Sequence, residues 1–286
     1  MKRQTKFEIL LSVILIARST SFMISKFMLG GMGPFTILSN RYIIAFIVMA
    51  ALFIKNIKNT NKEIIIKAAI IGFVYTIVMG FEMYGLNLTD SGTCSFLEHT
   101  AIVIVPFMNG IIIKKFPEKI SVVSAILAMA GVGFLTLGNA SARFNIGYVY
   151  CLLAAISYAV AIIITTNFSK EVDDSILLGV YQVGFMGLFC FIMSILTEAP
   201  RIPNSGNEWF CILYLALVCS GFGIAIQPFA QSGTTAERSA LIASLNPLSV
   251  AVLGVVLLHE PLTFAYVAGG ALVMAGILVA VATDKL

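Results

Sequence analysis

The sequence predicts an all-α membrane protein of ten transmembrane helices, arranged as two inverted five-helix repeats. Three observations support this: long apolar blocks, a bias of lysine and arginine between alternate connections, and a match of the chain with itself at a fixed offset. Of the 286 residues, 59% are hydrophobic and 11% are charged, with a mean hydropathy of +0.99. A soluble domain needs roughly a quarter of its residues charged, so the composition excludes that class.

The apolar blocks have the length of membrane-spanning helices. A helix rises about 1.5 Å per residue, so about twenty residues cross a hydrocarbon core of roughly 30 Å. A strand of a membrane barrel needs only about ten residues of alternating polarity, and block length therefore favours helices. The ten predicted spans are approximately 7–28, 34–54, 63–87, 92–113, 119–138, 147–167, 175–196, 208–230, 234–257 and 263–282.

The N-terminal block is predicted to be the first span. The stretch from Met1 to Lys6 precedes an apolar run, as in a secretory signal peptide. However, Arg18 and Lys26 interrupt the run, and no small-residue cleavage site follows it.

The lysines and arginines orient the chain. With the N-terminus in the cytoplasm, the cytoplasmic segments hold twelve of these residues, and the opposite side holds only Arg143 and Arg201. Cytoplasmic loops of membrane proteins carry such an excess. The bias predicts a multi-pass protein of the cell membrane with both termini in the cytoplasm, which requires an even number of spans.

An internal match predicts two repeats, at residues 1–138 and 147–286. The segment 90–93 (Asp-Ser-Gly-Thr), followed by Pro106, matches the segment 231–234 (Gln-Ser-Gly-Thr), followed by Pro247, at an offset of 141 residues. Each repeat would have five spans, an odd number, so the second must be inverted relative to the first. Inverted repeats are typical of secondary transporters, which bind substrate near mid-membrane between the two halves.

Several stretches of this sequence resemble one transporter family. They are Ser-Asn-Arg-Tyr-Ile-Ile-Ala around Arg41, Leu-Asn-Pro at 245–247, Leu-Leu-His-Glu-Pro-Leu-Thr at 257–263, Gly-Gly at 269–270 and Ala-Gly-Ile at 275–277. In these stretches, and in order along nearly the whole chain, the sequence resembles the ten-helix EamA-type branch of the drug/metabolite transporter superfamily. The resemblance implies a ten-helix fold with cytoplasmic termini, a central cavity, and transport of amino acids or related metabolites.

The chain departs from this family at two places. The segment 114–119 (Lys-Lys-Phe-Pro-Glu-Lys) replaces the Gly-Glu-Arg/Pro ending of the family's first repeat, and Arg18 stands where the family commonly has a Trp-Gly pair. The substrates of relatives therefore do not carry over to this chain.

Five ionisable residues fall inside predicted spans. Their distances along the helices place all five between mid-membrane and the outer interface. An ionised side chain in lipid costs at least about 2.5–3.5 kcal/mol, so we expect these side chains to face a hydrated cavity or one another. They are Arg18, Arg41, Glu82, Glu98 and His99.

Two interpretations of these residues remain open. In the first, arginines and glutamates form ion pairs that hold the helices in register, which we favour for Arg41. In the second, they bind substrate, which we favour for Arg18 and for Glu98 with His99. Two arginines and two carboxylates suit a zwitterion, whose carboxylate binds arginine and whose ammonium binds glutamate. His99 or either glutamate could also carry a coupling proton.

The second half of the chain contributes polar but uncharged candidates. Tyr158, Gln182 and Asn246 lie near the middle of their spans and are predicted to line the same site, although interhelical hydrogen bonding is the commoner role of such residues. Pro106 and Pro247 interrupt helices and free a backbone carbonyl, which predicts kinks that could act as hinges.

These observations predict a secondary transporter that moves an amino acid or related zwitterion across the membrane, with export the expected direction. The alternative is a channel or a lipid-carrier flippase of the same fold. The sequence has no catalytic, P-loop or cysteine metal-site motif, so we expect no enzyme, cofactor or metal. The expected partners are the lipid bilayer, the substrate and a coupling proton; we expect no nucleic acid, and a monomer or homodimer.

Overall fold

The computed structural model describes residues 3–57, 60–89, 91–112, 114–137, 146–258 and 264–283. Over these residues the chain forms helices and no strand. Arg143, which entered the charge count, and residues 259–263, which carry part of the family resemblance, lie outside the described residues.

The helices follow the predicted spans closely. Their bounds are α1 (Arg3–Met28), α2 (Pro34–Leu52), α3 (Ile54–Ile57), α4 (Lys62–Leu88), α5 (Ser91–Glu98), α6 (Ala101–Ile112), α7 (Lys119–Leu137), α8 (Ile146–Glu171), α9 (Ser175–Thr197), α10 (Gly206–Tyr214), the π-helix η1 (Leu215–Ala225), α11 (Gln227–Ser232), α12 (Ala236–Ala243), α13 (Leu245–Leu258) and α14 (Phe264–Thr283).

Side-chain caps explain where several of these helices begin. The Asn61 side chain accepts a hydrogen bond from the Ile64 amide at the start of α4, and Asp174 accepts from two amides at the start of α9. Ser205 caps α10 and Thr235 caps α12 in the same way. Each cap satisfies a backbone N–H that has no partner inside its helix.

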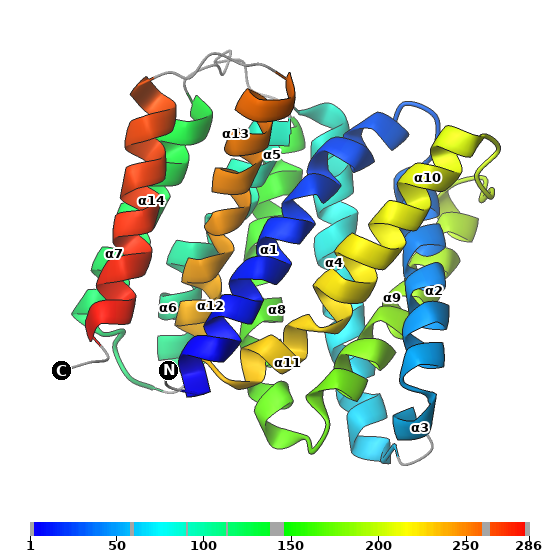
Figure 1. Ribbon diagram of the computed structural model, residues 1–286, viewed down its shortest axis with the longest axis horizontal. Helices are drawn as coiled ribbons and strands as arrows, with labels where there is room; N and C mark the ends of the chain where they lie inside the picture. Colours follow the sequence, from blue (N-terminus) through cyan, green and yellow to red (C-terminus); the bar gives the residue numbers. More distant parts are fainter. Residues whose placement is uncertain are drawn as a thin grey trace.

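The helices pack side by side as a bundle (Figure 1). The most extensive contacts are those of α7 with α14, α4 with α8, and α2 with α9, while α1 packs against η1, α11 and α13. Figure 1 shows α7 and α14 at one edge, α2, α9 and α10 at the other, and α1 and α8 between them. Segments from both halves of the chain therefore meet in the middle of the bundle.

Seven helical stretches of the described residues are long and apolar enough to cross a membrane. The predicted fifth and tenth spans correspond to α7 and α14, which contain the apolar stretches Lys119–Gly131 and Val267–Gly276, and the predicted ninth span forms the two short helices α12 and α13. The seven are Gln4–Met28, Pro34–Leu52, Lys62–Leu88, Cys94–Ile112, Ile146–Glu171, Ser175–Thr197 and Gly206–Ser232. The protein is thus an all-α, multi-pass membrane protein.

Three of the predicted spans are not continuous α-helices. The span 92–113 breaks between α5 and α6, the span 208–230 contains η1, and the span 234–257 breaks at Ser244. Pro106 lies inside α6, seven residues beyond the break at His99, whereas Pro247 is the third residue of α13. The interruptions therefore precede the prolines rather than coincide with them.

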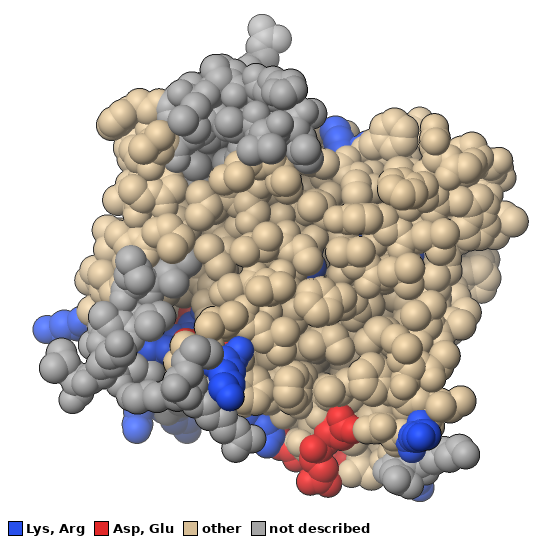
Figure 2. Space-filling model, in the orientation of Figure 1, with Lys and Arg blue, Asp and Glu red and all other residues tan. Residues whose placement is uncertain are grey.

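The start of α1, the end of α14 and α3 lie at one end of the bundle, which we call the terminus-bearing end; the connection between α9 and α10 lies at the opposite end (Figure 1). Figure 2 shows that most charged side chains visible on this face gather at the terminus-bearing end, while the surface above it is mostly uncharged. This distribution agrees with the predicted bias of lysine and arginine.

At the terminus-bearing end, polar contacts join the two halves of the chain. Arg238 of α12 forms an ion pair with Glu8 of α1 at 2.5 Å, and Thr234 donates to the same carboxylate at 3.2 Å. Asn109 of α6 donates to Glu237 of α12. These contacts hold α1 and α6 against α12.

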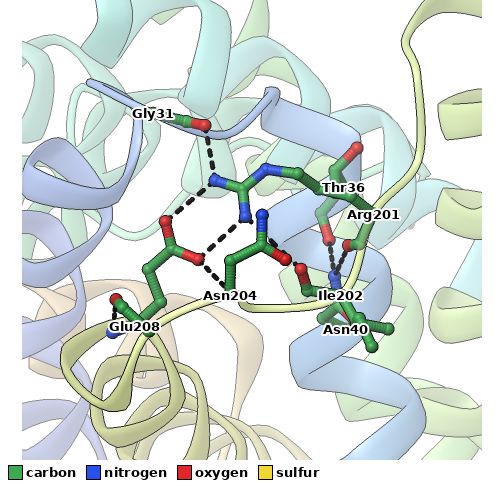
Figure 3. Close-up of polar contacts among 8 residues, drawn as sticks. Gly31, Thr36, Asn40, Arg201, Ile202, Asn204 and Glu208 are labelled. Atoms are coloured by element: carbon green, nitrogen blue, oxygen red, sulfur yellow. Dashed lines mark hydrogen bonds and ion pairs between the residues drawn. The ribbon is translucent and has the colours of Figure 1, made fainter.

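At the opposite end, Arg201 joins three segments (Figure 3). Its guanidinium donates to both carboxylate oxygens of Glu208, at 2.8 Å each, and to the carbonyl of Gly31 at 2.7 Å. Its own carbonyl accepts from Asn40 of α2 at 2.9 Å. The bidentate geometry makes this contact more specific than an ordinary surface ion pair.

A second carboxylate at this end fixes the start of α2. Glu198, just after α9, accepts hydrogen bonds from the backbone amides of Phe35 and Thr36, at 2.8 and 2.9 Å, and from the Thr36 hydroxyl at 2.7 Å. A negative charge at a helix N-terminus is favourable because the amides there lack helical partners. The contact ties α2 of the first half to α9 of the second.

Candidate functional site

The five ionisable residues predicted to lie within the membrane are all buried, between 1% and 8% exposed. Three helices of the first half carry Arg18 (α1), Arg41 (α2) and Glu82 (α4), Glu98 ends α5, and His99 follows it. Arg18 lies within electrostatic range of Glu82, and Glu82 interacts with Glu98. The structure therefore brings the predicted residues together in a polar centre inside the bundle.

A chain of hydrogen bonds links Arg18 to both halves of the protein. The guanidinium donates to Oε1 of Gln227 at 2.6 Å, and Nε2 of Gln227 donates to the hydroxyl of Tyr75 at 2.9 Å. The aliphatic part of Arg18 lies against Gly223, where a Cβ atom would come within 2.7 Å of Arg18 Cγ. The absence of a side chain at Gly223 thus makes room for Arg18.

Arg41 is held by neutral partners. Its Nε donates to the hydroxyl of Ser220 at 2.9 Å, and its Nη1 donates to the hydroxyl of Ser21 at 3.1 Å. The guanidinium carbon also lies 4.8 Å from the centroid of the Tyr42 ring, a cation–π distance. Ser220, like Gly223, belongs to η1, so both arginines lie against the π-helix. Such helices are rare and occur frequently at functional sites.

The expectation that these arginines form ion pairs with the buried glutamates is wrong for the described residues. The ion pairs among the described residues, with N–O distances of up to 4.0 Å, join Lys67 with Glu63 and Glu171, Arg201 with Glu208, and Arg238 with Glu8. Arg18 and Arg41 instead use Gln227, Ser220 and Ser21, which satisfy N–H groups without neutralising charge. The centre therefore holds two guanidinium charges with no carboxylate in direct contact.

Glu82 and Glu98 lie within electrostatic range of each other, and the thiol of Cys94, one turn before Glu98 on α5, lies 3.7 Å from the carbonyl oxygen of Glu82. An ionised carboxylate only accepts hydrogen bonds, so a hydrogen bond between two carboxyl groups requires a proton on one of them. Oε2 of Glu98 is buried and has no hydrogen-bond partner among the described residues. Buried polar atoms without partners are rare in folded proteins and call for an explanation.

His99 presents a free ring nitrogen to the same region. Its Nδ1 lies 2.6 Å from the carbonyl oxygen of Ser95, which can only accept, so Nδ1 carries the proton in the neutral ring. Nε2 is then an acceptor, and it is buried with no partner in the described part of the chain. The ring packs edge-on to Tyr158 at 6.2 Å between centroids.

The uncharged candidates occupy different positions. Tyr158 lies within electrostatic range of Arg18 and packs against Tyr75 at 6.3 Å, so it borders the polar centre. Gln182 on α9 is fully buried, and both atoms of its amide lack partners within the described segments. Asn246 on α13 is buried with an unpartnered Oδ1. No contact links Gln182 or Asn246 to the charged residues in the described structure.

Sequence reasoning missed four residues that contact the arginines. Ser21 and Tyr42 contact Arg41, Ser220 binds Arg41, and Gln227 binds Arg18. Gln227 was the easiest to find, because a glutamine directly before a proline inside an apolar span is a strong polar signal. Serines carry a weaker signal, since most of them bond to their own helix.

A cavity of about 350 Å³ lies at the terminus-bearing end; of the predicted site residues, Pro106 lines it, whereas the five buried ionisable residues do not. It is bordered by α6, the segment 115–118, α7 and α12. Ile102 and Leu241, which pack together with Ala125 and Ala128, form its apolar wall. Ile102 lies four residues, about one helical turn, beyond Glu98. The polar part of the lining is Lys115, Glu118, Ser121, Ser124, Thr235, Glu237 and Arg238.

An all-α multi-pass membrane fold with a buried polar centre between its two halves is the arrangement of a membrane transporter for small molecules. The chain belongs to the EamA-like transporter family, which matches residues 6–137 and 145–282. The match covers nearly the whole chain and confirms the family resemblance found in the sequence.

Similar proteins carry transporter names. An uncharacterized transporter of Archaeoglobus fulgidus is 23% identical over 270 residues, covering 94% of this chain and 83% of its own length. The uncharacterized transporter YetK of Bacillus subtilis is 22% identical and covers 99% of this chain and 89% of its own length. A biotin transporter of Salmonella typhimurium is 20% identical over 78% of this chain and 74% of its own length.

The fold also matches a solved protein. One crystal structure has a TM-score of 0.77 to this chain at 16% identity, covering 99% of this chain and 97% of the other. This similarity concerns the fold alone.

Proposed function

We propose that the protein is a secondary transporter that exports an amino acid or related zwitterion across the cell membrane by alternating access. The observation that carries this proposal is the buried Arg18, which binds the neutral Gln227 and lies near the Glu82–Glu98 pair without an ion pair. A substrate carboxylate would replace Gln227 as the acceptor for Arg18. A substrate ammonium group would bind the glutamates.

The positions of the helices support ten spans in two inverted repeats. The first half begins α1, α2, α4, α5 and α7 at residues 3, 34, 62, 91 and 119, and α8, α9, α10, α12 and α14 begin 143, 141, 144, 145 and 145 residues later. The pairing α7 with α14 and α2 with α9 joins corresponding helices, as a two-fold axis between the halves requires. Secondary transporters exchange the conformations of two such halves to alternate access.

The cavity at the terminus-bearing end supports access from the cytoplasm. If both termini are cytoplasmic, as the lysine and arginine bias predicts, this cavity of about 350 Å³ opens to the cytoplasm, and its apolar wall includes Ile102, about one turn beyond Glu98. At the opposite end, contacts of Arg201 (Figure 3) and of Glu198 join segments of the two halves. A cytoplasmic opening suits an exporter that loads substrate inside the cell.

The alternative, a lipid-carrier flippase, is less well supported. A second groove of about 360 Å³ lies between α2 and η1, and its lining residues include Met49, Phe53, Leu217 and Phe222. All of its lining residues are apolar. The groove therefore has no polar side chain to bind a lipid headgroup, although an acyl chain would fit there.

Transport by purified protein in liposomes tests the proposal. We expect saturable uptake of at least one member of a panel of amino acids, assayed with and without a pH gradient. Biotin belongs in the panel because it shares the carboxylate that Arg18 would bind and because a similar protein carries its name. Flux that rises linearly with concentration would instead indicate a channel, and no flux of any carboxylate would contradict the proposal.

Cysteine labelling tests the topology. The exposed Asn207 lies at the opposite end and the exposed Asp173 lies at the terminus-bearing end. In a Cys211→Ser background, we expect Asn207→Cys to react with a membrane-impermeant maleimide in intact cells, and Asp173→Cys to react only after permeabilisation. The remaining native cysteines are buried and provide a low background. Labelling of Asp173→Cys in intact cells would reverse the orientation and remove the argument for export.

A further inference from the structure

We propose that Glu82 and Glu98 form one proton-binding site, in which a single proton is shared between the two carboxyl groups and competes with the ammonium group of the substrate. The competition rests on the proposed function, whereas the proton site does not. Because proton and ammonium exclude each other, inward movement of a proton would be exchanged for outward movement of substrate.

The positions of the two glutamates support a proton shared between their carboxyl groups. Glu82 comes from α4 and Glu98 from the end of α5, and their side chains are 5% and 3% exposed. The thiol of Cys94, one turn before Glu98 on α5, donates to the carbonyl of Glu82 at 3.7 Å, so both glutamates lie where α4 and α5 meet, within electrostatic range of each other. Two ionised carboxylates cannot bind each other, since neither has a proton to donate. Like charges in a poorly hydrated site also disfavour a doubly ionised pair. One proton on the pair satisfies both requirements.

The charged and titratable surroundings set the charge of the site. Arg18 and Arg41 lie within electrostatic range, and the other groups in range are neutral side chains. Two of the helices packed against α5 are α13 and α7; α13 has no titratable residue, and α7 has only Lys119, at its start. With one shared proton, the pair carries one negative charge beside two guanidinium groups. The neutral titratable groups are Tyr75 (α4), Cys94 (α5), and Cys151 and Tyr158 (α8).

Two unpartnered acceptors support the binding of the substrate ammonium group at the same place. Oε2 of Glu98 and Nε2 of His99 are both buried acceptors, and neither has a hydrogen-bond partner among the residues that the structure describes. They belong to consecutive residues at the break between α5 and α6. An ammonium group has three N–H donors and no acceptor, so it complements this pair of acceptors. When it binds, its positive charge replaces that of the shared proton.

Infrared spectroscopy of the purified protein tests the proton site without any substrate. At neutral pH we expect the C=O stretching band of a protonated carboxyl group in the wild type. We expect Glu82→Gln and Glu98→Gln each to lose the whole band, because the remaining carboxylate, close to two arginines, ionises. Glu63→Gln is the control, since the Glu63 carboxylate is 56% exposed and paired with Lys67; it should keep the band.

Two results would overturn the proton site. One is a wild-type spectrum without a protonated carboxyl band, which does not depend on how the variants fold. The other is a band that survives in either glutamine variant, because two independent carboxyl groups would each contribute part of it.

The competition has its own test. Adding a transported amino acid should reduce the band and release about one proton per protein into weakly buffered solution, whereas the same acid without its amino group should release none. An unchanged band with a saturating, transported amino acid would reject the competition and leave the proton site standing. If the band is present but the protein transports no amino acid, the proton site is supported and the proposed substrate class is rejected.

Discussion

Arg18→Ala is expected to have the largest effect on function and to lower the rate of saturable transport by a large factor. The substitution removes the guanidinium proposed to bind the substrate carboxylate and leaves Oε1 of Gln227 without its 2.6 Å donor. Losing one partner of a buried, hydrogen-bonded charge pair costs about 2–5 kcal/mol. This corresponds to a loss of roughly 30-fold to several thousandfold in kcat/KM.

Liposome transport of the amino acid that the wild type transports best measures this effect. Arg18→Lys keeps the charge but lacks the planar fork of donors, so it should retain part of the activity with a raised KM. Size-exclusion chromatography of both variants separates loss of binding from loss of folding. Wild-type kinetics in a well-folded Arg18→Ala protein would remove Arg18 from the substrate site.

Gly179→Ala should have the largest effect on stability. An added Cβ at Gly179 on α9 would lie 1.8 Å from the carbonyl oxygen of Ala225, the last residue of η1, so backbone would have to move. Overpacking typically costs about 1–3 kcal/mol and occasionally more, and a backbone obstacle belongs at the upper end. We expect the thermal transition in detergent to fall by roughly 6–12 °C.

The control for this substitution is Gly206→Ala at the start of α10. A Cβ at Gly206 meets nothing within 4 Å, and surface changes of this kind usually alter stability by less than about 0.5 kcal/mol. Equal transitions for the two variants would show that α9 and η1 are not closely packed at Gly179.

Most of the fold could be predicted because a membrane restricts the possible structures. Block length alone located the helices to within a few residues, since only closed hydrogen-bonding structures cross a bilayer. A Cβ at Gly131 would lie 2.6 Å from the carbonyl oxygen of Gly269, so α7 packs closely on α14 at these two glycines. Ser175 begins α9 at the predicted residue, and Lys62 begins α4 one residue before the predicted start.

The partners of the buried charges could not be predicted in the same way. The sequence identified Arg18 and Arg41 as buried because charges are conspicuous in apolar spans. It did not reveal that they bond to Gln227 and Ser220, because that depends on which faces of distant helices meet. The π-helical geometry of η1 was also missed, since apolar periodicity does not distinguish a wide turn from an α-turn in a uniformly apolar segment.

The π-helix has a mechanical consequence. Each wide turn contains one residue more than an α-turn, so closing a single one to α geometry would rotate everything beyond it by about 100°, the arc of one residue. Gln227 follows η1 directly and would swing away from Arg18, while Ser220, inside η1, would lose its alignment with Arg41. A change in the winding of this one segment would therefore take the internal acceptors away from both guanidinium groups and leave them free to receive an external one.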